Sequence, residues 1–157
     1  MEHKKIKLLH HLLSEIEQHI PFKDTTNTIV SQVTVGWQLD HALKVTNAVC
    51  RVLIKTNPNK YKKEFNFTRM LLFPLCYIPR GKAKAPKIVL PPDFISTEDL
   101  FQQLKTARAQ IENVKPLPKT SHFIHHIFGM LSKEQTLRFL EIHTKHHLKI
   151  VRDILKK

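Results

Sequence analysis

Apolar residues recur at the spacing of an amphipathic helix in several long stretches of the chain. The first stretch predicts a helix over Glu2–His19, which Pro21 ends because proline cannot continue a helix. Its apolar stripe consists of Ile6, Leu9, Leu12, Leu13, Ile16 and Ile20. A second, longer helix is predicted over Thr28–Thr56, ahead of the breaker Asn57-Pro58-Asn59.

The second predicted helix is apolar on two sides. Trp37 and His41 lie one turn apart on one side, and the other side carries Leu39, Leu43, Cys50 and Leu53. The arc expected to face water carries Asp40, Lys44, Asn47, Arg51 and Lys55. A helix apolar on two sides is either central in its domain or packed against a second subunit, so we predict a homodimer as one use of this surface.

Capping residues mark the starts of two further helices. Ser96-Thr97-Glu98-Asp99 supplies an N-cap hydroxyl and early acidic residues for a third helix, which ends before Pro116. Ser132-Lys133-Glu134-Gln135 is a capping box that begins a fourth helix, with Phe128 and Leu131 as hydrophobic anchors just ahead of it. The pattern therefore predicts four main helices.

The stretch between the second and third helices is the least regular. A short helix is predicted within Glu64–Leu75, with Phe65, Met70, Leu72, Phe73 and Leu75 as buried anchors. Prolines and a glycine in Ile78–Pro86 favour an extended loop, and Ile88–Leu90 is the one candidate strand. We predict one all-α domain over residues 1–157, whose long crossover either covers a functional site or closes the bundle passively.

Composition narrows the class of protein. The 157 residues are 41% hydrophobic and 25% charged, which is typical of one soluble globular domain. Apolar runs are too short to cross a bilayer and the start lacks the features of a signal peptide, so we predict no membrane partner.

The two cysteines indicate the redox compartment. Cys50 and Cys76 stand apart without CxxC spacing, which favours reduced thiols in a cytoplasmic protein.

The net charge of +13 raises the question of nucleic-acid binding. The basic residues are spread along the whole chain, however, and few aromatic residues lie beside them to stack on bases. A solvated basic surface is therefore the favoured interpretation. The alternative function is a non-catalytic helical bundle that binds an anionic partner.

Histidines concentrate in the last helix, within Glu141–Leu148. At about 100° per residue, His143 and His147 share the apolar stripe, while His146 lies on its flank. A buried His-x-x-x-His pair can hold one metal ion. His41 is the best third ligand, because it lies on an apolar face of another long helix. The alternative is that all three are core histidines held by hydrogen bonds.

A second histidine cluster precedes Gly129, which suggests a turn. His122 and His126 are interpreted as surface or cap residues, whereas His125 is a candidate for substrate contact or for supporting a ligand. Thr144 stands where a zinc protease would carry its glutamate base, which argues against that chemistry.

Several segments together resemble the DinB-like (YfiT-like) proteins, from about Thr34 to the end. Trp37-Gln38-Leu39-Asp40-His41 resembles their W-x-L-x-H segment, and His143–His147 resembles the H-x-x-H-H segment of their last helix. Three further segments are similar to a branch of unknown function; these are Ile78–Lys82, His125–Gly129 and Leu131–Gln135. The chain departs from that branch at His126, where proline is usual, which puts the role of the His125 region in doubt.

The resemblance implies a four-helix bundle with up-down-down-up connectivity and a long crossover between helices two and three. It implies a divalent ion on His41, His143 and His147, and His-only sites suit zinc, nickel, copper or iron. It also implies homodimers, small-molecule substrates and low-molecular-weight thiols, as in thiol S-transferases. Trp37, His125 and His146 are then candidates for contact with substrate or ligands. Hydrolysis by metal-activated water is the alternative reaction.

Overall fold

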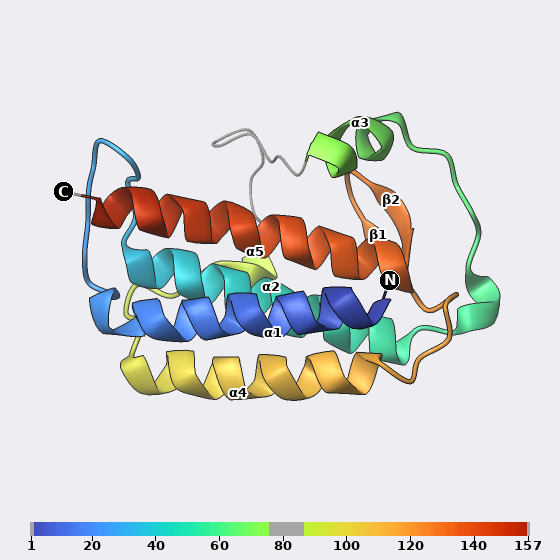
Figure 1. The fold of residues 1–157 in the computed structure, drawn as a ribbon, viewed down its shortest axis with the longest axis horizontal. Coiled ribbons are helices and arrows are strands. Elements are labelled where there is room, and N and C mark those ends of the chain that lie inside the picture. The colour runs from blue at the N-terminus through green and yellow to red at the C-terminus, as the bar shows by residue number, and fades with distance from the viewer. Residues whose placement is uncertain (1, 76–86, 157) are drawn as a thin grey trace.

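The computed structural model describes residues 2–75 and 87–156, and these are mostly helical (Figure 1). Five α-helices occur in this part of the chain: α1 Glu2–His19, α2 Val35–Lys55, α3 Phe67–Leu75, α4 Thr97–Val114 and α5 Lys133–Leu155. Three short 3-10 helices are η1 Ile20–Phe22, η2 Pro58–Lys60 and η3 Lys87–Val89. Strands β1 His122–His125 and β2 Gly129–Ser132 form one small antiparallel sheet. The predicted helical class is therefore confirmed, with a sheet added.

The long helices pack along one another (Figure 1). Helix α2 contacts α4 and α5, and α1 contacts the same two helices from the other side. Their apolar stripes meet in a core whose fully buried members include Leu13, Ile16, Leu43, Ile111 and Leu140. Of the helices in residues 2–75 and 87–156, none combines the length and the apolar character needed to span a membrane.

Caps set the helix starts. The hydroxyl of Ser132 and the side chain of Gln135 form the predicted capping box of α5, and Ser96 caps α4. Helix α2 begins later than predicted, at Val35, because the Thr34 hydroxyl accepts a hydrogen bond of 3.0 Å from the backbone N–H of Trp37. Residues 28–33 instead form a turn, an isolated bridge from Ser31 to Asn27 and a bend, so the predicted start at Thr28 is wrong.

The hairpin of β1 and β2 was not predicted from the sequence. Its strands are four residues long, and the turn between them is completed by Gly129 at a φ of 66°. His122 pairs with Ser132 across the sheet and is buried, so its assignment as a surface residue is wrong. The prediction of a strand over Ile88–Leu90 is also wrong, because Lys87–Val89 forms the 3-10 helix η3.

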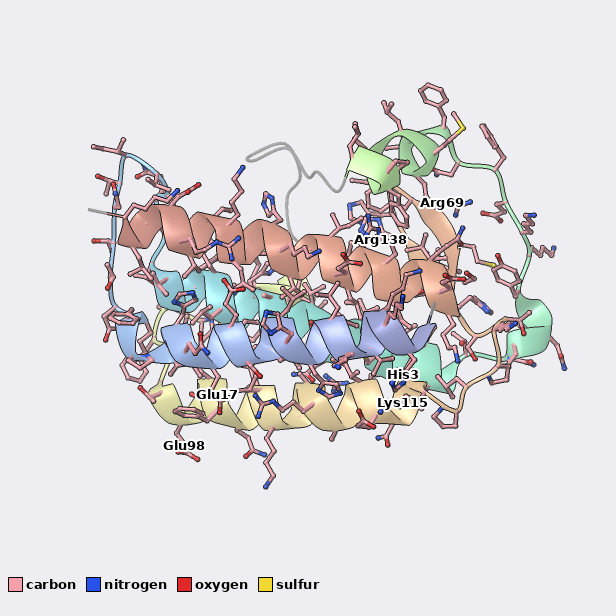
Figure 2. All side chains as sticks on the ribbon, in the orientation of Figure 1. His3, Glu17, Arg69, Glu98, Lys115 and Arg138 are labelled. Atoms are coloured by element: carbon pink, nitrogen blue, oxygen red, sulfur yellow. The ribbon has the colours of Figure 1, made fainter. Side chains whose placement is uncertain are left out.

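Helix α3 differs from its prediction in both start and burial. It begins at Phe67, where the Asn66 side chain accepts from the backbone N–H of Arg69 at 2.8 Å. Leu72 and Phe73 pack on the core as predicted. The other three predicted anchors are exposed: Phe65, Met70 and Leu75. The side chain of Arg69 extends from α3 to the hairpin (Figure 2). One side of α3 therefore contacts the hairpin, and another side is exposed to solvent.

Two expectations for the surfaces of α2 are wrong. Asp40 and Asn47, predicted to face water, are buried against α4, where the Gln103 side chain donates to Asp40 at 2.6 Å and Asn47 donates to the Gln103 carbonyl at 3.0 Å. The second apolar side of α2 is buried within the chain and cannot form an intersubunit surface; its members are Leu39, Leu43, Cys50 and Leu53. The homodimer itself stays a prediction.

Two further expectations concern residues outside the described part of the chain. These are the free thiol of Cys76 and the extended loop over Ile78–Pro86, which includes one segment of the DinB-like resemblance. The thiol of Cys50 is free and buried, and burial raises its pKa to about 12. That thiol is therefore protonated and shielded at neutral pH.

Candidate metal centre

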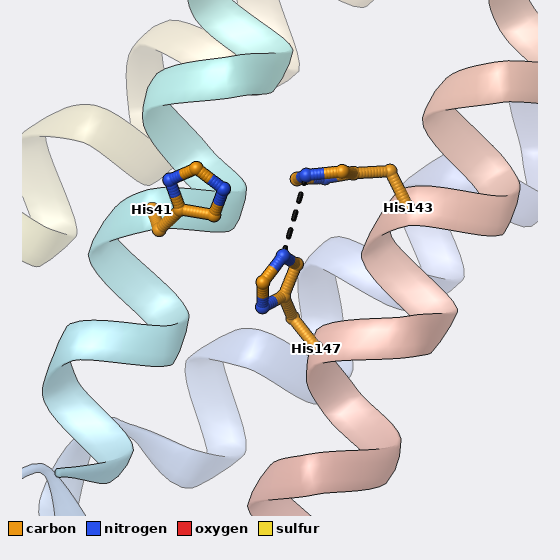
Figure 3. Close-up of side chains that lie close together, drawn as sticks. All are labelled: His41, His143 and His147. Carbon is orange, nitrogen blue, oxygen red and sulfur yellow. Dashed lines mark hydrogen bonds between the residues drawn. The ribbon is translucent and has the colours of Figure 1, made fainter. Parts of the chain in front are cut away.

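The structure brings together the three histidines that the sequence singled out (Figure 3). His41 extends from α2, and His143 and His147 extend from α5 one turn apart. One ring nitrogen from each lies within 4.8 Å of the other two. The ring centroids are 5.2 Å apart for His41 and His143, 4.8 Å for His41 and His147, and 4.5 Å for His143 and His147. Such a group could hold a metal ion.

Packing of α2 against α5 creates this arrangement. His143 and His147 are on the stripe of α5 that also buries Leu140 and Val151. His41 and His147 are themselves buried, and His143 is partly buried. Imidazoles in an apolar core lose their contacts with water, so their ring nitrogens need partners within the protein or an ion.

Two of the three rings have a fixed orientation. The Nδ1 atom of His41 lies 2.9 Å from the Val89 carbonyl oxygen in η3. The Nδ1 atom of His147 lies 2.6 Å from the Oε1 atom of Gln38 in α2. Because both acceptors are oxygens, each Nδ1 carries the hydrogen, and the lone pair on each Nε2 is left for an ion or for a hydrogen bond from another ring. Metal-bound histidines are usually held in this way by their second nitrogen.

His143 completes the group from the other side. Its Nε2 atom is hydrogen-bonded to the Nε2 atom of His147 at a distance of 3.3 Å (Figure 3). Two nitrogens bound to one zinc-sized ion at about 2.0–2.1 Å and at a tetrahedral angle would be about 3.3 Å apart, the same separation. The Nδ1 atom of His143 is buried and lacks a hydrogen-bond partner in the described part of the chain. The donor types of the trio, and the spacing of the His143–His147 pair, therefore fit a small divalent ion.

Electrostatics keep the group neutral. Burial lowers the pKa of His143 and of His147 well below the ordinary value, and the neighbouring histidines lower each pKa further. Burial also lowers the pKa of His41, against the opposing effect of its hydrogen bond to Val89. At neutral pH all three rings are uncharged, which is the state that binds a metal.

Two aromatic rings flank the histidines. Trp37 stacks on His41 with centroids 5.2 Å apart and planes at 22°. His146 approaches His147 edge-on, with centroids 5.0 Å apart. Trp37 and His146 are both partly exposed. Each of them therefore contacts solvent on one side and a buried histidine of the trio on the other. Their predicted contact with a substrate stays a prediction.

Comparisons with protein-family models, with curated proteins and with solved structures found no match for this chain. Function is therefore inferred from the chemistry of the histidine trio and its surroundings. The resemblance to DinB-like proteins rests on the short sequence segments alone and is not tested by these comparisons.

His125 has a local role in the hairpin. Its Nδ1 atom accepts from the backbone N–H groups of Ile127 and Phe128, at 3.1 and 3.3 Å, and so closes the turn. Its ring packs on Phe139 with centroids 4.8 Å apart, and Phe139 in turn lies 5.6 Å from His143. His125 thus reaches the trio through one intervening ring. His126 is exposed, as predicted.

The sequence analysis missed Gln38 and Val89, which orient two of the histidines. Gln38 lies three residues before His41 on a helix whose neighbouring positions are apolar, so a buried polar partner could have been inferred from helical spacing. Val89 acts through its backbone carbonyl, which no side-chain pattern reveals. Asp40, next to His41, is instead paired with Lys44 at 2.7 Å and faces α4.

Proposed function

We propose that this protein binds one divalent metal ion through the Nε2 atoms of His41, His143 and His147. The observation that carries the proposal is the convergence of three neutral imidazoles, two of which are buried and already oriented through Nδ1. The separation of 3.3 Å between the paired Nε2 atoms supports it. Ligand type makes zinc, nickel or iron the leading candidates, with copper also compatible.

The proposed reaction is a metal-dependent transformation of a small molecule, with a low-molecular-weight thiol as cosubstrate. An ion held by His41, His143 and His147 would leave an open position, and it would make a thiol or water bound there lose its proton more readily. Asp40 cannot serve as a general base, since Lys44 and Gln103 occupy its carboxylate. Either nucleophile would then be activated at the ion itself; the resemblance to DinB-like proteins favours a thiol S-transferase, and hydrolysis is the alternative.

We further propose that the chain is a DinB-like protein. The four long helices α1, α2, α4 and α5 are the elements that an up-down-down-up bundle with a crossover between its second and third helices requires. The three histidines occupy the positions that the resemblance assigns to the metal ligands. A homodimer and small-molecule substrates follow from the same proposal.

Single substitutions test the ligand set. Changing His41, His143 or His147 to Ala should each remove most of the bound metal, because two imidazoles hold such an ion much less tightly than three. His11→Ala is the matched control, since His11 is exposed on α1. Circular dichroism confirms that each variant is folded. Full metal content in two or more of the ligand variants would refute the proposed site.

A second experiment separates thiol from water chemistry. The protein is loaded with Co²⁺, and a small thiol such as 2-mercaptoethanol is added while the visible spectrum is recorded. Direct binding of the thiolate should add an intense near-ultraviolet band that the His143→Ala variant does not show. A spectrum unchanged by thiol would count against the transferase and favour the hydrolase.

The net charge of +13 supports a second candidate, a non-catalytic bundle that binds an anionic partner. Retention of the metal-free protein on a polyanion, with a steep dependence on salt, would favour this candidate. Loss of metal in the ligand variants without any change in that retention would show that the two properties are independent.

A further inference from the structure

Helix α3 carries a continuous apolar face that is exposed to solvent. Phe67, Met70, Leu71 and Leu75 follow the i, i+3, i+4, i+8 spacing of one helix side, and their exposed fractions are 64%, 54%, 53% and 62%. Phe65, just ahead of the helix, is 80% exposed. We call these five residues the α3 apolar face. Large apolar side chains that gather on a surface mark an interaction site.

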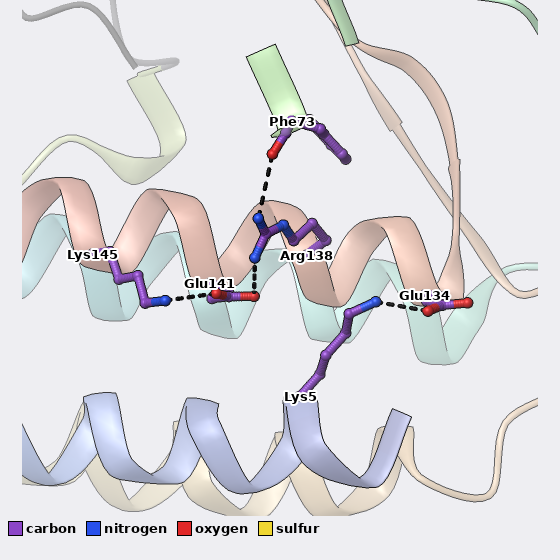
Figure 4. A network of polar contacts seen from close by, with 6 residues as sticks. All are labelled: Lys5, Phe73, Glu134, Arg138, Glu141 and Lys145. Carbon is purple, nitrogen blue, oxygen red and sulfur yellow. Dashed lines mark hydrogen bonds and ion pairs between the residues drawn. The ribbon is translucent and has the colours of Figure 1, made fainter. Parts of the chain in front are cut away.

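The opposite side of α3 is fixed to the protein. Phe73 packs on Phe128 with ring centroids 5.2 Å apart, and the Arg69 guanidinium donates to the carbonyls of Phe128 and Met130 at 3.1 and 2.8 Å. From α5, Arg138 donates to the Phe73 carbonyl at 3.4 Å (Figure 4). These contacts hold α3 so that its apolar face points away from the core.

The hairpin next to α3 carries exposed apolar residues of its own. Asn66 donates to the Ile127 carbonyl at 3.0 Å, which ties the start of α3 to the hairpin turn. Ile127 and Ile124 are 38% and 65% exposed. Exposed apolar residues are therefore present on two elements that are hydrogen-bonded to each other.

Positive charge lies close to the α3 apolar face, where Lys63 lines the same surface hollow as Phe65 and Met70. Lys60, Lys62 and Lys63 are exposed in the segment that leads into α3. The whole chain carries a net charge of +13. Two copies meeting face to face would bring these lysines together and repel, whereas an anionic partner with an apolar interior satisfies both the lysines and the apolar face. The surface of a bilayer that contains anionic lipids offers both.

We propose that the α3 apolar face docks on an anionic membrane surface, with α3 lying in the interface and Lys60, Lys62 and Lys63 contacting lipid headgroups. A short apolar helix of this kind inserts only to the depth of the headgroup region, which makes the attachment reversible. The proposal departs from the sequence prediction of no membrane partner, because the exposed side of α3 could not be recognised before the core was known. It is independent of the metal site.

Flotation with lipid vesicles tests the proposal. The full chain is mixed with vesicles of phosphatidylcholine alone or of phosphatidylcholine with phosphatidylserine, at low and high salt. We expect binding to the vesicles with phosphatidylserine, weakened by salt because screening shortens the reach of the lysines. The double variant Phe67→Ser with Leu71→Ser should bind the vesicles at least about tenfold more weakly, since two large apolar contacts are lost.

Matched variants make the test specific. Ile29→Ser removes another exposed apolar side chain, far along the chain in the loop before α2, and should bind like the wild type. Changing Lys60, Lys62 and Lys63 to Gln should abolish the preference for phosphatidylserine. Changing three other exposed lysines, Lys7, Lys105 and Lys149, to Gln removes the same charge and should reduce binding much less.

Three outcomes would overturn the proposal. The first is the absence of wild-type protein from the floating vesicles, and the second is equal flotation of the double variant and the Ile29→Ser control. The third is a concentration-dependent dimer in light scattering that the double variant abolishes, because that result would assign the α3 apolar face to a second copy of the chain.

Discussion

The side chain of Gln38 on α2 accepts a hydrogen bond of 2.6 Å from the Nδ1 atom of His147 on α5. The amide nitrogen of Gln38 in turn donates to the Ser31 hydroxyl at 3.3 Å, an arrangement consistent with the amide oxygen facing the histidine. This short chain of contacts joins the loop before α2 to a candidate ligand. It sets the tautomer of His147 and directs its Nε2 atom toward His143.

Changing Gln38 to Leu should weaken metal binding about 10- to 100-fold, because loss of such a supporting contact leaves the ligand ring free to rotate and change tautomer. Competition with a chromophoric chelator measures the affinity. Gln38→Glu, which keeps an acceptor at the same place, should restore most of it. Gln102→Leu, at an exposed site on α4, is the control. Equal affinities for Gln38→Leu and Gln102→Leu would exclude a positioning role for Gln38.

His125 should make stability depend on pH. Burial, reinforced by the charge of His126, lowers the pKa of His125 from 6.5 to about 4. The unfolded chain therefore binds the proton more tightly, so the contribution of the neutral ring is complete above about pH 6.5 and is lost progressively as the pH falls toward about 4. Acidification thus disfavours the folded state.

His125→Asn provides the comparison, because its side-chain oxygen can accept from the same turn amides but does not titrate. Between about pH 7.5 and about pH 5, the metal-free wild type should lose about 1–2 kcal/mol more unfolding free energy than the variant, the lower figure allowing for solvent screening of this partly exposed ring. Urea unfolding with a chelator present measures both. Parallel losses in the two proteins would show that His125 is not the titrating group.

Gly129 should tolerate alanine poorly. Its φ of 66° is in the left-handed region, and an added Cβ would lie 3.4 Å from a carboxylate oxygen of Glu64. We expect Gly129→Ala to cost about 1–2 kcal/mol of unfolding free energy, and Gly129→Asn to cost less, because asparagine enters this region more readily. Thermal or urea unfolding measures the difference. Wild-type stability of the alanine variant would contradict the hairpin geometry.

Arg69 should control the attachment of α3. Its guanidinium bridges the carbonyls of Phe128, Met130 and Glu64, an arrangement that a lysine cannot reproduce. Arg69→Lys should increase hydrogen exchange across Phe67–Leu75 by about tenfold, since about 1–2 kcal/mol of local stabilisation is lost. Arg51→Lys, at an exposed position on α2, is the control. Unchanged exchange in α3 would mean that packing of Leu72 and Phe73 alone holds the helix.

The long helices were predictable because their signals are local. The spacing of apolar residues, Pro21, and the caps at Ser96 and Ser132 correctly placed the ends of α1 and the starts of α4 and α5. The start of α2 was placed too early, since Ile29 and Val33 continue an apolar spacing that the cap at Thr34 interrupts. A single hydroxyl decided that boundary.

Features that depend on tertiary contacts were not predictable. The four-residue strands of the hairpin are too short to show alternation, and the exposed side of α3 looks like a core stripe in the sequence. The three histidines were found because helical spacing places His143 and His147 on one buried face. The carbonyl of Val89 and the hydrogen bond from His147 to Gln38 required the packed structure.

The most direct test of the account is the metal content of the purified protein. The protein is stripped with a chelator, supplied in turn with zinc, nickel and iron(II), freed of excess ion, and measured by inductively coupled plasma mass spectrometry. Three converging imidazoles predict about one divalent ion per chain in the wild type and in His11→Ala, and far less in His143→Ala. A folded wild type that retains none of these ions would contradict the account and leave the trio as core histidines.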